Sequence, residues 1–217
     1  MTGLINSSCS RRAEGFASAR RTIRPNHRAG QVKVTLERPG FLTLRARRLL
    51  DEADVVIHDR LVPQAILDLA RREAVMIDAG KQGFGPAMSQ TEINALIVAH
   101  VAKGAQVVRL KSGDPTVFGR LDEELDAVTT AGHSYDIVPG LTAASAAVAA
   151  IGQSLTRRGR NASVRFLTGH DMQGFADHDW AALSRPGEVA AVYMGRKAAR
   201  FLQGRMLMHG AAHATPV

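Results

Sequence analysis

Polar and charged residues follow several short apolar runs, each at the point where the run ends. Asp59 follows the run 54–58, and Lys81 comes shortly after the run 74–78. A third run is followed by the segment 111–115, with the sequence Lys-Ser-Gly-Asp-Pro. If these runs are neighbouring parallel strands, their carboxyl ends meet at one edge of a sheet, which is where ligands bind in open α/β folds. The spacing therefore predicts a site assembled from several loops.

Three further segments have the same relation to apolar runs. They are 139–143, 168–170 and 194–195, with the sequences Pro-Gly-Leu-Thr-Ala, Thr-Gly-His and Met-Gly. In the Ser-Gly-Asp-Pro loop, Gly113 lets the backbone approach a ligand closely, Asp114 offers a carboxylate and Pro115 fixes the turn. The loops together indicate binding of a small molecule at the shared edge.

Each of these residues also has a purely structural interpretation. Asp59 is either a base at the edge of a cleft or the cap of a helix that begins near Pro63. The segment 113–115 is either a ligand-binding loop or a tight turn with an aspartate helix cap. Lys81 is either an acid or a solvated loop lysine, and Met194 is either a ligand contact or a core residue. Spacing alone leaves all of these alternatives open.

Several other chemistries lack their sequence signatures. The motifs G-x-G-x-x-G, G-x-x-x-x-G-K-[ST] and G-x-S-x-G are absent, so nicotinamide, P-loop and common serine-hydrolase sites are unsupported. Metal-ligand spacing is missing from the histidines at 170, 178, 209 and 213, and no metal is expected. Cys9 is the single cysteine, which excludes a disulfide framework and favours a reducing, cytoplasmic location.

The net charge of +8 suggests either nucleic acid or an acidic ligand as a partner. Residues 1–30 contain six arginines and one acid, so the rest of the chain is only mildly basic. Aromatic residues make up 5%, too few for an obvious stacking platform on single-stranded nucleic acid. The apolar segment 141–151 is too short to span a bilayer. We therefore expect neither nucleic acid nor a membrane as a partner.

Short runs rich in valine and isoleucine alternate with helical patterns from Gln31 onward. The predicted strands are 32–36, 54–58, 74–78, 106–110, 135–138, 163–167 and 189–193. The predicted helices are 42–52, 89–103, 122–130, 142–150 and 197–208, with a capping box at Ser89 and Glu92 and stops at Gly132 and Gly210. This alternation predicts an α/β fold with mainly parallel sheets covered by helices.

The sequence divides into three parts. Residues 1–30 are rich in serine, arginine and alanine and are expected to be a disordered basic extension, with an organelle transit peptide or a misplaced translation start as the alternatives. A boundary near Pro139-Gly140 would separate an N-terminal α/β lobe, 31–138, from a C-terminal α/β lobe, 139–217.

Five segments of the chain resemble, in order, those of the tetrapyrrole methylases, and within them the uroporphyrinogen-III C-methyltransferases. They are LTLRARRLLDEADVVIHDRLV (42–62), VRLKSGDPTVFGR (108–120), IVPGLTAASAA (137–147), SVRFLTGH (163–170) and VYMG (192–195). The resemblance implies a two-lobed fold with the cofactor cleft between the lobes, and it implies that the second lobe is truncated here.

The resemblance also implies an activity and its residues. Members of the family use S-adenosylmethionine, without a metal, to methylate uroporphyrinogen III at two ring carbons, giving precorrin-2 for sirohaem or cobalamin synthesis. The positions that match the family's cofactor-binding motifs are Ser112, Gly113, Asp114, Val117, Thr142, Ala143 and Met194. Asp59 matches the family's proposed proton acceptor, although His58 precedes it where the family has tyrosine, and Lys81 matches the proposed proton donor.

Two partners follow from the same resemblance. The substrate is a tetrapyrrole with many carboxylates, for which arginine and lysine are suitable ligands. Candidates on that ground are Arg60, Lys111, Arg120 and Arg157. The second partner is another copy of the chain, because members of the family form homodimers.

Departures from the family pattern support an alternative function. The segment 32–44 is shorter than the family's glycine-rich first loop, Ser112 replaces a glycine, and the sequence stops at Val217 where the family begins another strand. These features favour a degenerate, non-catalytic homologue that binds a tetrapyrrole or dimerises. A methylase of a later precorrin and an RNA methyltransferase of the same superfamily are further alternatives; the latter predicts binding that falls steeply with salt.

Overall fold

The structure is a computed structural model that describes residues 39–80 and 88–215. The predicted strand at 32–36 and the candidate acid Lys81 lie outside the described residues. Within them, two parallel sheets are accompanied by helices, so the predicted α/β fold class is confirmed.

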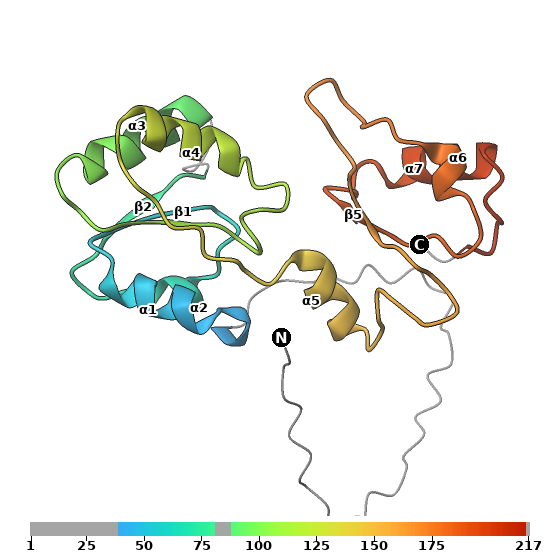
Figure 1. The fold of residues 1–217 in the computed structure, drawn as a ribbon, viewed down its shortest axis with the longest axis horizontal. Helices are drawn as coiled ribbons and strands as arrows, with labels where there is room; N and C mark the ends of the chain where they lie inside the picture. The colour runs from blue at the N-terminus through green and yellow to red at the C-terminus, as the bar shows by residue number, and fades with distance from the viewer. Residues whose placement is uncertain (1–38, 81–87, 216–217) are drawn as a thin grey trace, which may run out of the picture. The chain divides into compact units, whose positions relative to one another are not determined.

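The first sheet has three parallel strands in the order β2-β1-β3, of which β1 and β2 are labelled in Figure 1. They are β1 (Val55–His58), β2 (Val75–Asp78) and β3 (Val107–Leu110), which confirms three of the predicted strands. The register pairs His58 with Asp78 on one side and with Leu110 on the other, so the three carboxyl ends lie at one edge. All four residues of β1 are buried, as expected for a central parallel strand.

Side chains of β1 alternate between two hydrophobic clusters, one on each face of the first sheet. Val55 and Ile57 pack with residues of α3 and α4, whereas Val56 packs with residues of α1 and α2. These helices are α1 (Leu44–Glu52), α2 (Gln64–Leu67), α3 (Gln90–Val101) and α4 (Leu121–Thr130). Helices therefore cover both faces of this sheet, which leaves its edges for ligands.

The predicted capping box at the start of α3 is present. The Ser89 hydroxyl accepts a hydrogen bond from the Glu92 amide at 3.2 Å, and the Glu92 carboxylate accepts one from the Ser89 amide at 2.6 Å. Bonds from the Ser89 amide and hydroxyl lower the pKa of Glu92. The charged form of Glu92 is therefore bound more tightly in the folded chain than in the unfolded one.

This lowered pKa predicts how the contribution of Glu92 to stability depends on pH. A carboxylate whose pKa is lower in the folded state stabilises above its unfolded pKa, about 4.3, and loses that effect as pH falls through the folded pKa. We expect Glu92→Gln to reduce the free energy of unfolding most above about pH 5, with a difference from wild type that shrinks at lower pH. Urea titrations across pH measure it, with exposed Glu73→Gln as the control; a difference that grows with acid would contradict it.

The second sheet pairs β4 (Arg165–Thr168) with β5 (Ala190–Tyr193) in parallel, and Thr168 is level with Tyr193. Both strands were predicted. The remaining helices are α5 (Ala143–Ala150), α6 (Trp180–Leu183) and α7 (Ala199–Met208). The Trp180 ring of α6 lies 5.8 Å from the Phe201 ring of α7, edge to face. Such aromatic contacts add to the area that the two rings bury.

One predicted strand is wrong. Residues 135–138 form no strand, although their residue types suit one. A strand needs a neighbour for its hydrogen-bond ladder. Here β3 is the edge of its sheet, and β3 and the segment 134–141 both line a cavity of about 600 Å³. Tyr135 remains 48% exposed and Ile137 39% exposed, consistent with a segment that has not joined the sheet.

The helix ends agree with the sequence prediction. Gly132 and Gly210 follow α4 and α7 with φ angles of 77° and 91°, as in a left-handed helix stop.

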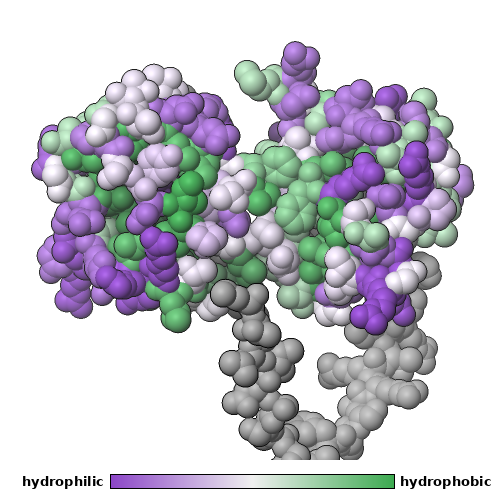
Figure 2. Space-filling model, in the orientation of Figure 1, coloured by the Kyte–Doolittle hydropathy of each residue, from purple (hydrophilic) through white to green (hydrophobic). Residues whose placement is uncertain are grey.

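In the described part of the chain, no helix is long and apolar enough to cross a membrane. Apolar as well as hydrophilic side chains are visible on the face drawn in Figure 2. The two sheets lie on either side of Pro139-Gly140 in the sequence, and the division of the chain at that point stays a prediction.

Candidate functional site

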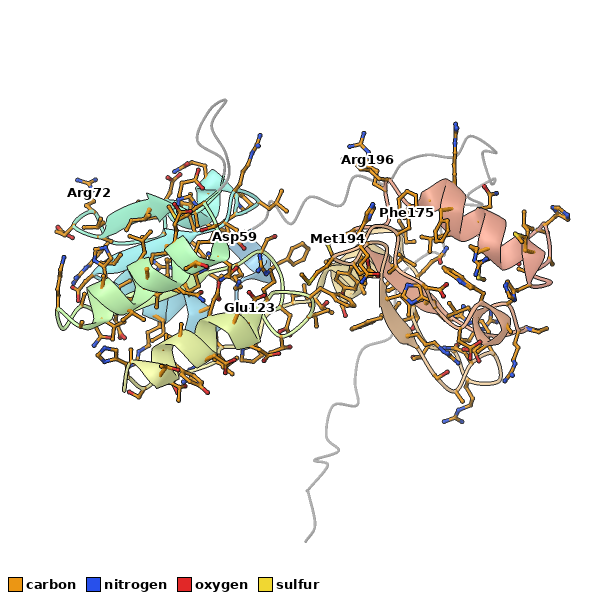
Figure 3. All side chains as sticks on the ribbon, turned by 90° about the horizontal axis from the view of Figure 1, so that it is seen from above. Asp59, Arg72, Glu123, Phe175, Met194 and Arg196 are labelled. Atoms are coloured by element: carbon orange, nitrogen blue, oxygen red, sulfur yellow. The ribbon has the colours of Figure 1, made fainter. Side chains whose placement is uncertain are left out.

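Asp59 lies at the carboxyl edge of the first sheet, directly after β1 (Figure 3). Its amide donates to the Leu110 carbonyl at 3.1 Å, which ties the end of β1 to the end of β3. The side chain is 36% exposed and its Oδ1 atom forms an ion pair with the Arg109 guanidinium. The alternative that Asp59 caps a helix is wrong, because the N-cap of α2 is Pro63. Asp59 is thus a partly exposed carboxylate held in one orientation at the edge.

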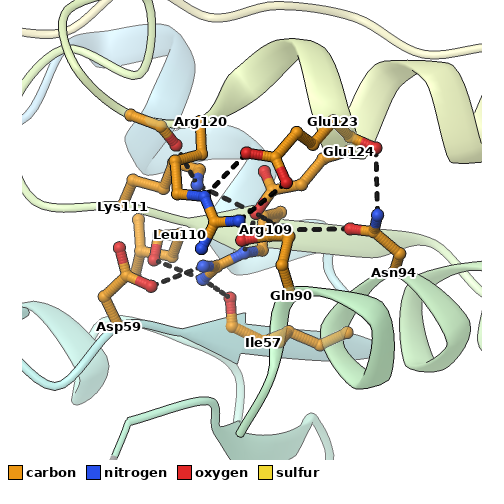
Figure 4. A network of polar contacts seen from close by, with 11 residues as sticks. Ile57, Asp59, Gln90, Asn94, Arg109, Leu110, Lys111, Arg120, Glu123 and Glu124 are labelled. Carbon is orange, nitrogen blue, oxygen red and sulfur yellow. Dashed lines mark hydrogen bonds and ion pairs between the residues drawn. The ribbon is translucent and has the colours of Figure 1, made fainter. Parts of the chain in front are cut away.

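Arg109 belongs to a buried polar network under this edge (Figure 4). Its side chain is 13% exposed, with Nε 3.0 Å from Glu124 Oε1 and Nη1 donating to the Ile57 carbonyl at 3.2 Å. The Glu124 side chain is 4% exposed and also binds Lys111 Nζ at 2.9 Å. The positive charges of Arg109 and Lys111 are therefore paired with the carboxylates of Asp59 and Glu124. Such pairing offsets the free-energy cost of burying charged groups. The network fixes Arg109, and Arg109 in turn fixes Asp59.

The structure revises one of the expected substrate ligands. Lys111 is 9% exposed and its ammonium group donates to the Gly119 carbonyl at 2.6 Å as well as binding Glu124, so it is committed within the protein. Arg120 is paired with Glu123 at 2.7 Å on the surface. Arg60 and Arg157 are exposed. The latter two residues retain the accessibility that a ligand for a substrate carboxylate needs.

The segment 111–119 forms a closed loop after β3. Asp114 Oδ1 accepts hydrogen bonds from the Thr116 amide at 2.9 Å and the Thr116 hydroxyl at 2.7 Å, which confirms the turn interpretation. The helix-cap interpretation is wrong, since the N-cap of α4 is Arg120. Within the turn, Asp114 uses Oδ1 alone, so Oδ2 is available to a ligand. A hydrogen-bonded turn that presents a carboxylate suits a ligand with hydroxyl or amino groups.

Two of the candidate loops meet at a pair of glycines. A Cβ atom on Gly140 would lie 2.1 Å from the Gly113 carbonyl oxygen, and Gly113 itself has a φ of 89°. A larger residue at position 140 would therefore require movement of the backbone, and a residue with a side chain at position 113 would be strained. The segments 112–117 and 139–143 are therefore close together, through an approach of the backbone that a side chain at position 140 would prevent, although 139–143 does not follow a strand as the sequence predicted.

Substitution of glycine by alanine should change the free energy of unfolding in opposite directions at Gly140, where this contact lies, and at Gly204. Gly140→Ala should lower the free energy of unfolding by about 1–3 kcal/mol, because the added methyl group meets backbone. Gly204→Ala, within α7 where nothing lies within 4 Å, should raise it by about 0.5–1 kcal/mol. Chemical denaturation of both variants measures this. Equal effects at the two positions would contradict the close approach of the loops.

The remaining cofactor candidates belong to the part of the chain that holds the second sheet. Thr142 is the N-cap residue of α5 and Ala143 begins that helix. Met194 follows β5 with a φ of 54° and is 57% exposed, so the interpretation of Met194 as a core residue is wrong. A positive φ is strained for a residue with a side chain, and such strain concentrates at functional sites. The other non-glycine residues with positive φ in the described part of the chain are Phe118 and Arg120.

Two residues of the site were missed in the sequence. Arg109 and Glu124 hold the edge of the first sheet together, but neither was assigned a role. A signal was present for Arg109, because a guanidinium within the apolar run Val-Val-Arg-Leu is rarely buried without a partner. Glu124 had none, since helix α4 carries three acidic residues in its first turn and only folding shows which one is buried.

Comparison with known proteins agrees with this arrangement. The family model of the tetrapyrrole (corrin/porphyrin) methylases matches residues 36–217. The chain belongs to the tetrapyrrole methylase family. Siroheme synthase 1 of Yersinia enterocolitica is 46% identical over 179 residues, which are 82% of this chain and 38% of that protein. The siroheme synthase of Baumannia cicadellinicola is also 46% identical, over 82% of this chain and 39% of its own length. The chain thus spans about two fifths of the length of these relatives.

Solved structures of the tetrapyrrole methylase family are similar as well. Uroporphyrin-III C-methyltransferase from Thermus thermophilus, complexed with S-adenyl homocysteine, has a TM-score of 0.64 and 34% identity, covering 80% of this chain and 73% of that one. A cobalt precorrin-4 methyltransferase has a TM-score of 0.70 at 22% identity, covering 80% and 71%. The second likeness shows the fold alone.

Proposed function

We propose that this chain catalyses the S-adenosylmethionine-dependent C-methylation of uroporphyrinogen III to precorrin-2, a step of sirohaem and cobalamin synthesis. The observation that carries the proposal is the close approach of Gly140 to Gly113, which brings the loops 112–117 and 139–143 together. The relative that is most informative was solved with S-adenyl homocysteine, the product form of this cofactor.

The residues present fit such a cofactor. Gly113 has no side chain and a φ of 89°, so its backbone is available for close contact with a ligand. Asp114 presents a free carboxylate oxygen that can accept from ribose hydroxyls, and Ser112 and Val117 flank it in the same loop. Thr142 and Ala143 stand at the start of α5, and exposed Met194 offers an apolar contact. We assign these six positions, together with Gly113, to cofactor binding.

Proton transfer and substrate binding fall to other side chains. When bound, S-adenosylmethionine supplies an activated methyl group, whose bond to sulfur breaks, with the electron pair kept by sulfur, as a bond to a pyrrole carbon forms. Asp59 would accept the proton that the macrocycle then loses, because Arg109 holds its carboxylate at the sheet edge. Lys81 is the proposed proton donor. Exposed Arg60 and Arg157 would bind substrate carboxylates.

Calorimetric titration with S-adenosylhomocysteine tests the assignment of the loop. Wild type should bind in the micromolar range. Asp114→Ala should lose this binding, since it removes both the carboxylate and the turn with Thr116. Asp114→Asn keeps an oxygen for the turn but not the charge, so it separates the role of the turn from that of the carboxylate. Folded wild type without binding would contradict the proposal and favour a non-catalytic homologue.

A further inference from the structure

Tyr193 supplies the hydrogen-bond acceptor that the start of α5 otherwise lacks. Helix N-termini leave backbone N–H groups unpaired, and the side chain of the N-cap residue commonly accepts from one of them. Thr142 occupies that position but makes no such bond. Instead the hydroxyl of Tyr193, the last residue of β5, accepts from the Ala144 amide at 3.2 Å and is hydrogen-bonded to the Thr142 hydroxyl. The cap of α5 therefore comes from a strand about fifty residues later in the chain.

The ring of Tyr193 is held by aromatic neighbours. Its centroid lies 5.1 Å from that of Phe118 and 5.7 Å from that of Phe166, in tilted arrangements. Such contacts stabilise a fixed ring position. Phe118 lies in the loop 111–119, which also carries Asp114 and Val117, and it has a φ of 51°. The ring of Tyr193 therefore contacts one of the proposed cofactor loops, and its hydroxyl binds the other.

We propose that Tyr193 is a positioning residue for the cofactor. It sets the place of Thr142 and Ala143 through its hydroxyl, without transferring a proton or touching the reacting carbon. The inference rests on the proposed function and deepens it, because it names the residue that shapes the binding site for the nucleoside of S-adenosylmethionine. Met194, the next residue, turns out of β5 with positive φ, so the same strand end supplies both the anchor and a contact.

Removal of the hydroxyl alone tests this role. Tyr193→Phe keeps the ring contacts and loses two hydrogen bonds. We expect binding of S-adenosylhomocysteine to weaken about 3- to 10-fold. This factor corresponds to the net free energy that an ordinary hydrogen bond contributes. The KM for S-adenosylmethionine should rise by a similar factor, while kcat and the KM for uroporphyrinogen III stay as in wild type. Tyr135→Phe is the matched control, since the chain has two tyrosines and Tyr135 is half exposed.

A second variant shows whether Tyr193 acts through Thr142. Thr142→Val removes the partner hydroxyl with little change of shape, and it should weaken binding by a factor similar to that of Tyr193→Phe. The double variant should bind about as weakly as the weaker single variant, because the hydrogen bond between Thr142 and Tyr193 is lost in each of the two single variants. Effects that multiply in the double variant would mean that the two hydroxyls act separately and would overturn the inference.

The remaining outcomes separate this inference from the proposed function. Wild type that binds no S-adenosylhomocysteine contradicts the proposed function and, with it, the inference. If wild type binds S-adenosylhomocysteine and the Tyr193→Phe variant binds it equally well, the inference alone is overturned. A Tyr193→Phe variant in which kcat and both KM values change together, with a lower melting temperature, marks a general structural role and also overturns the inference.

Discussion

Glu124→Ala should lower the free energy of unfolding by about 3–5 kcal/mol, the usual cost of removing one partner from a buried charge network. The Glu124 side chain is 4% exposed and binds both Arg109 and Lys111. Its loss leaves Lys111, 9% exposed, with only the Gly119 carbonyl as a hydrogen-bond acceptor in the described part of the chain. Arg109 keeps Asp59 but loses the contact that fixes its Nε atom.

The neighbouring residue provides a matched control. Glu123 lies on the same helix and also pairs with an arginine, Arg120, but its side chain is 50% exposed. Glu123→Ala should therefore cost less than about 1 kcal/mol. Urea denaturation of the two variants gives the comparison. Similar small losses for both would mean that the network around Arg109 contributes nothing to stability.

Asp59→Asn should reduce kcat for methylation on the order of 10²–10⁴-fold, the range typical for loss of a general base. The amide keeps the size of the side chain but neither accepts a proton nor pairs with the charge of Arg109. Binding of S-adenosylhomocysteine should stay close to that of wild type, because the proposed cofactor contacts come from other loops. Steady-state rates with saturating S-adenosylmethionine, beside a calorimetric titration, measure both quantities.

The opposite end of β1 provides the control for this prediction. Asp54 precedes the strand, pairs with Arg71 and accepts from the Gln106 amide at 2.8 Å. Asp54→Asn thus replaces a paired aspartate at the amino end of β1, where no candidate site residue lies. Its kcat should stay within about a factor of two of wild type. If Asp59→Asn retained wild-type activity, the assignment of Asp59 as the proton acceptor would be wrong.

Residue patterns were sufficient where local chemistry decides the structure. The capping box at Ser89 and Glu92, and the buried strand β1, depend on neighbouring residues and on a continuous apolar run. The helices α2 and α6 were not predicted, because four residues are too few for a helical period to show. The segment 135–138 was wrongly predicted as a strand, since pairing depends on what lies beside it.

The candidate site, too, could be predicted from the sequence only in part. The sequence predicted that loops would gather at the carboxyl ends of the strands, and the structure places Asp59 and the loop 111–119 at one such edge. It did not predict that Lys111 faces inward to Glu124, or that Tyr193 reaches Thr142. Those contacts join residues that are distant in the chain, and no spacing rule predicts which polar side chains a fold will bury against each other.

The most direct test of the account is incubation of the purified chain with uroporphyrinogen III and S-adenosylmethionine, followed by mass analysis of the tetrapyrrole. We expect a product with two added methyl groups and the spectrum of a precorrin-2 derivative, formed by wild type and by Asp54→Asn but not appreciably by Asp59→Asn. A folded wild-type chain that binds S-adenosylhomocysteine and leaves the tetrapyrrole unmethylated would contradict the proposed activity.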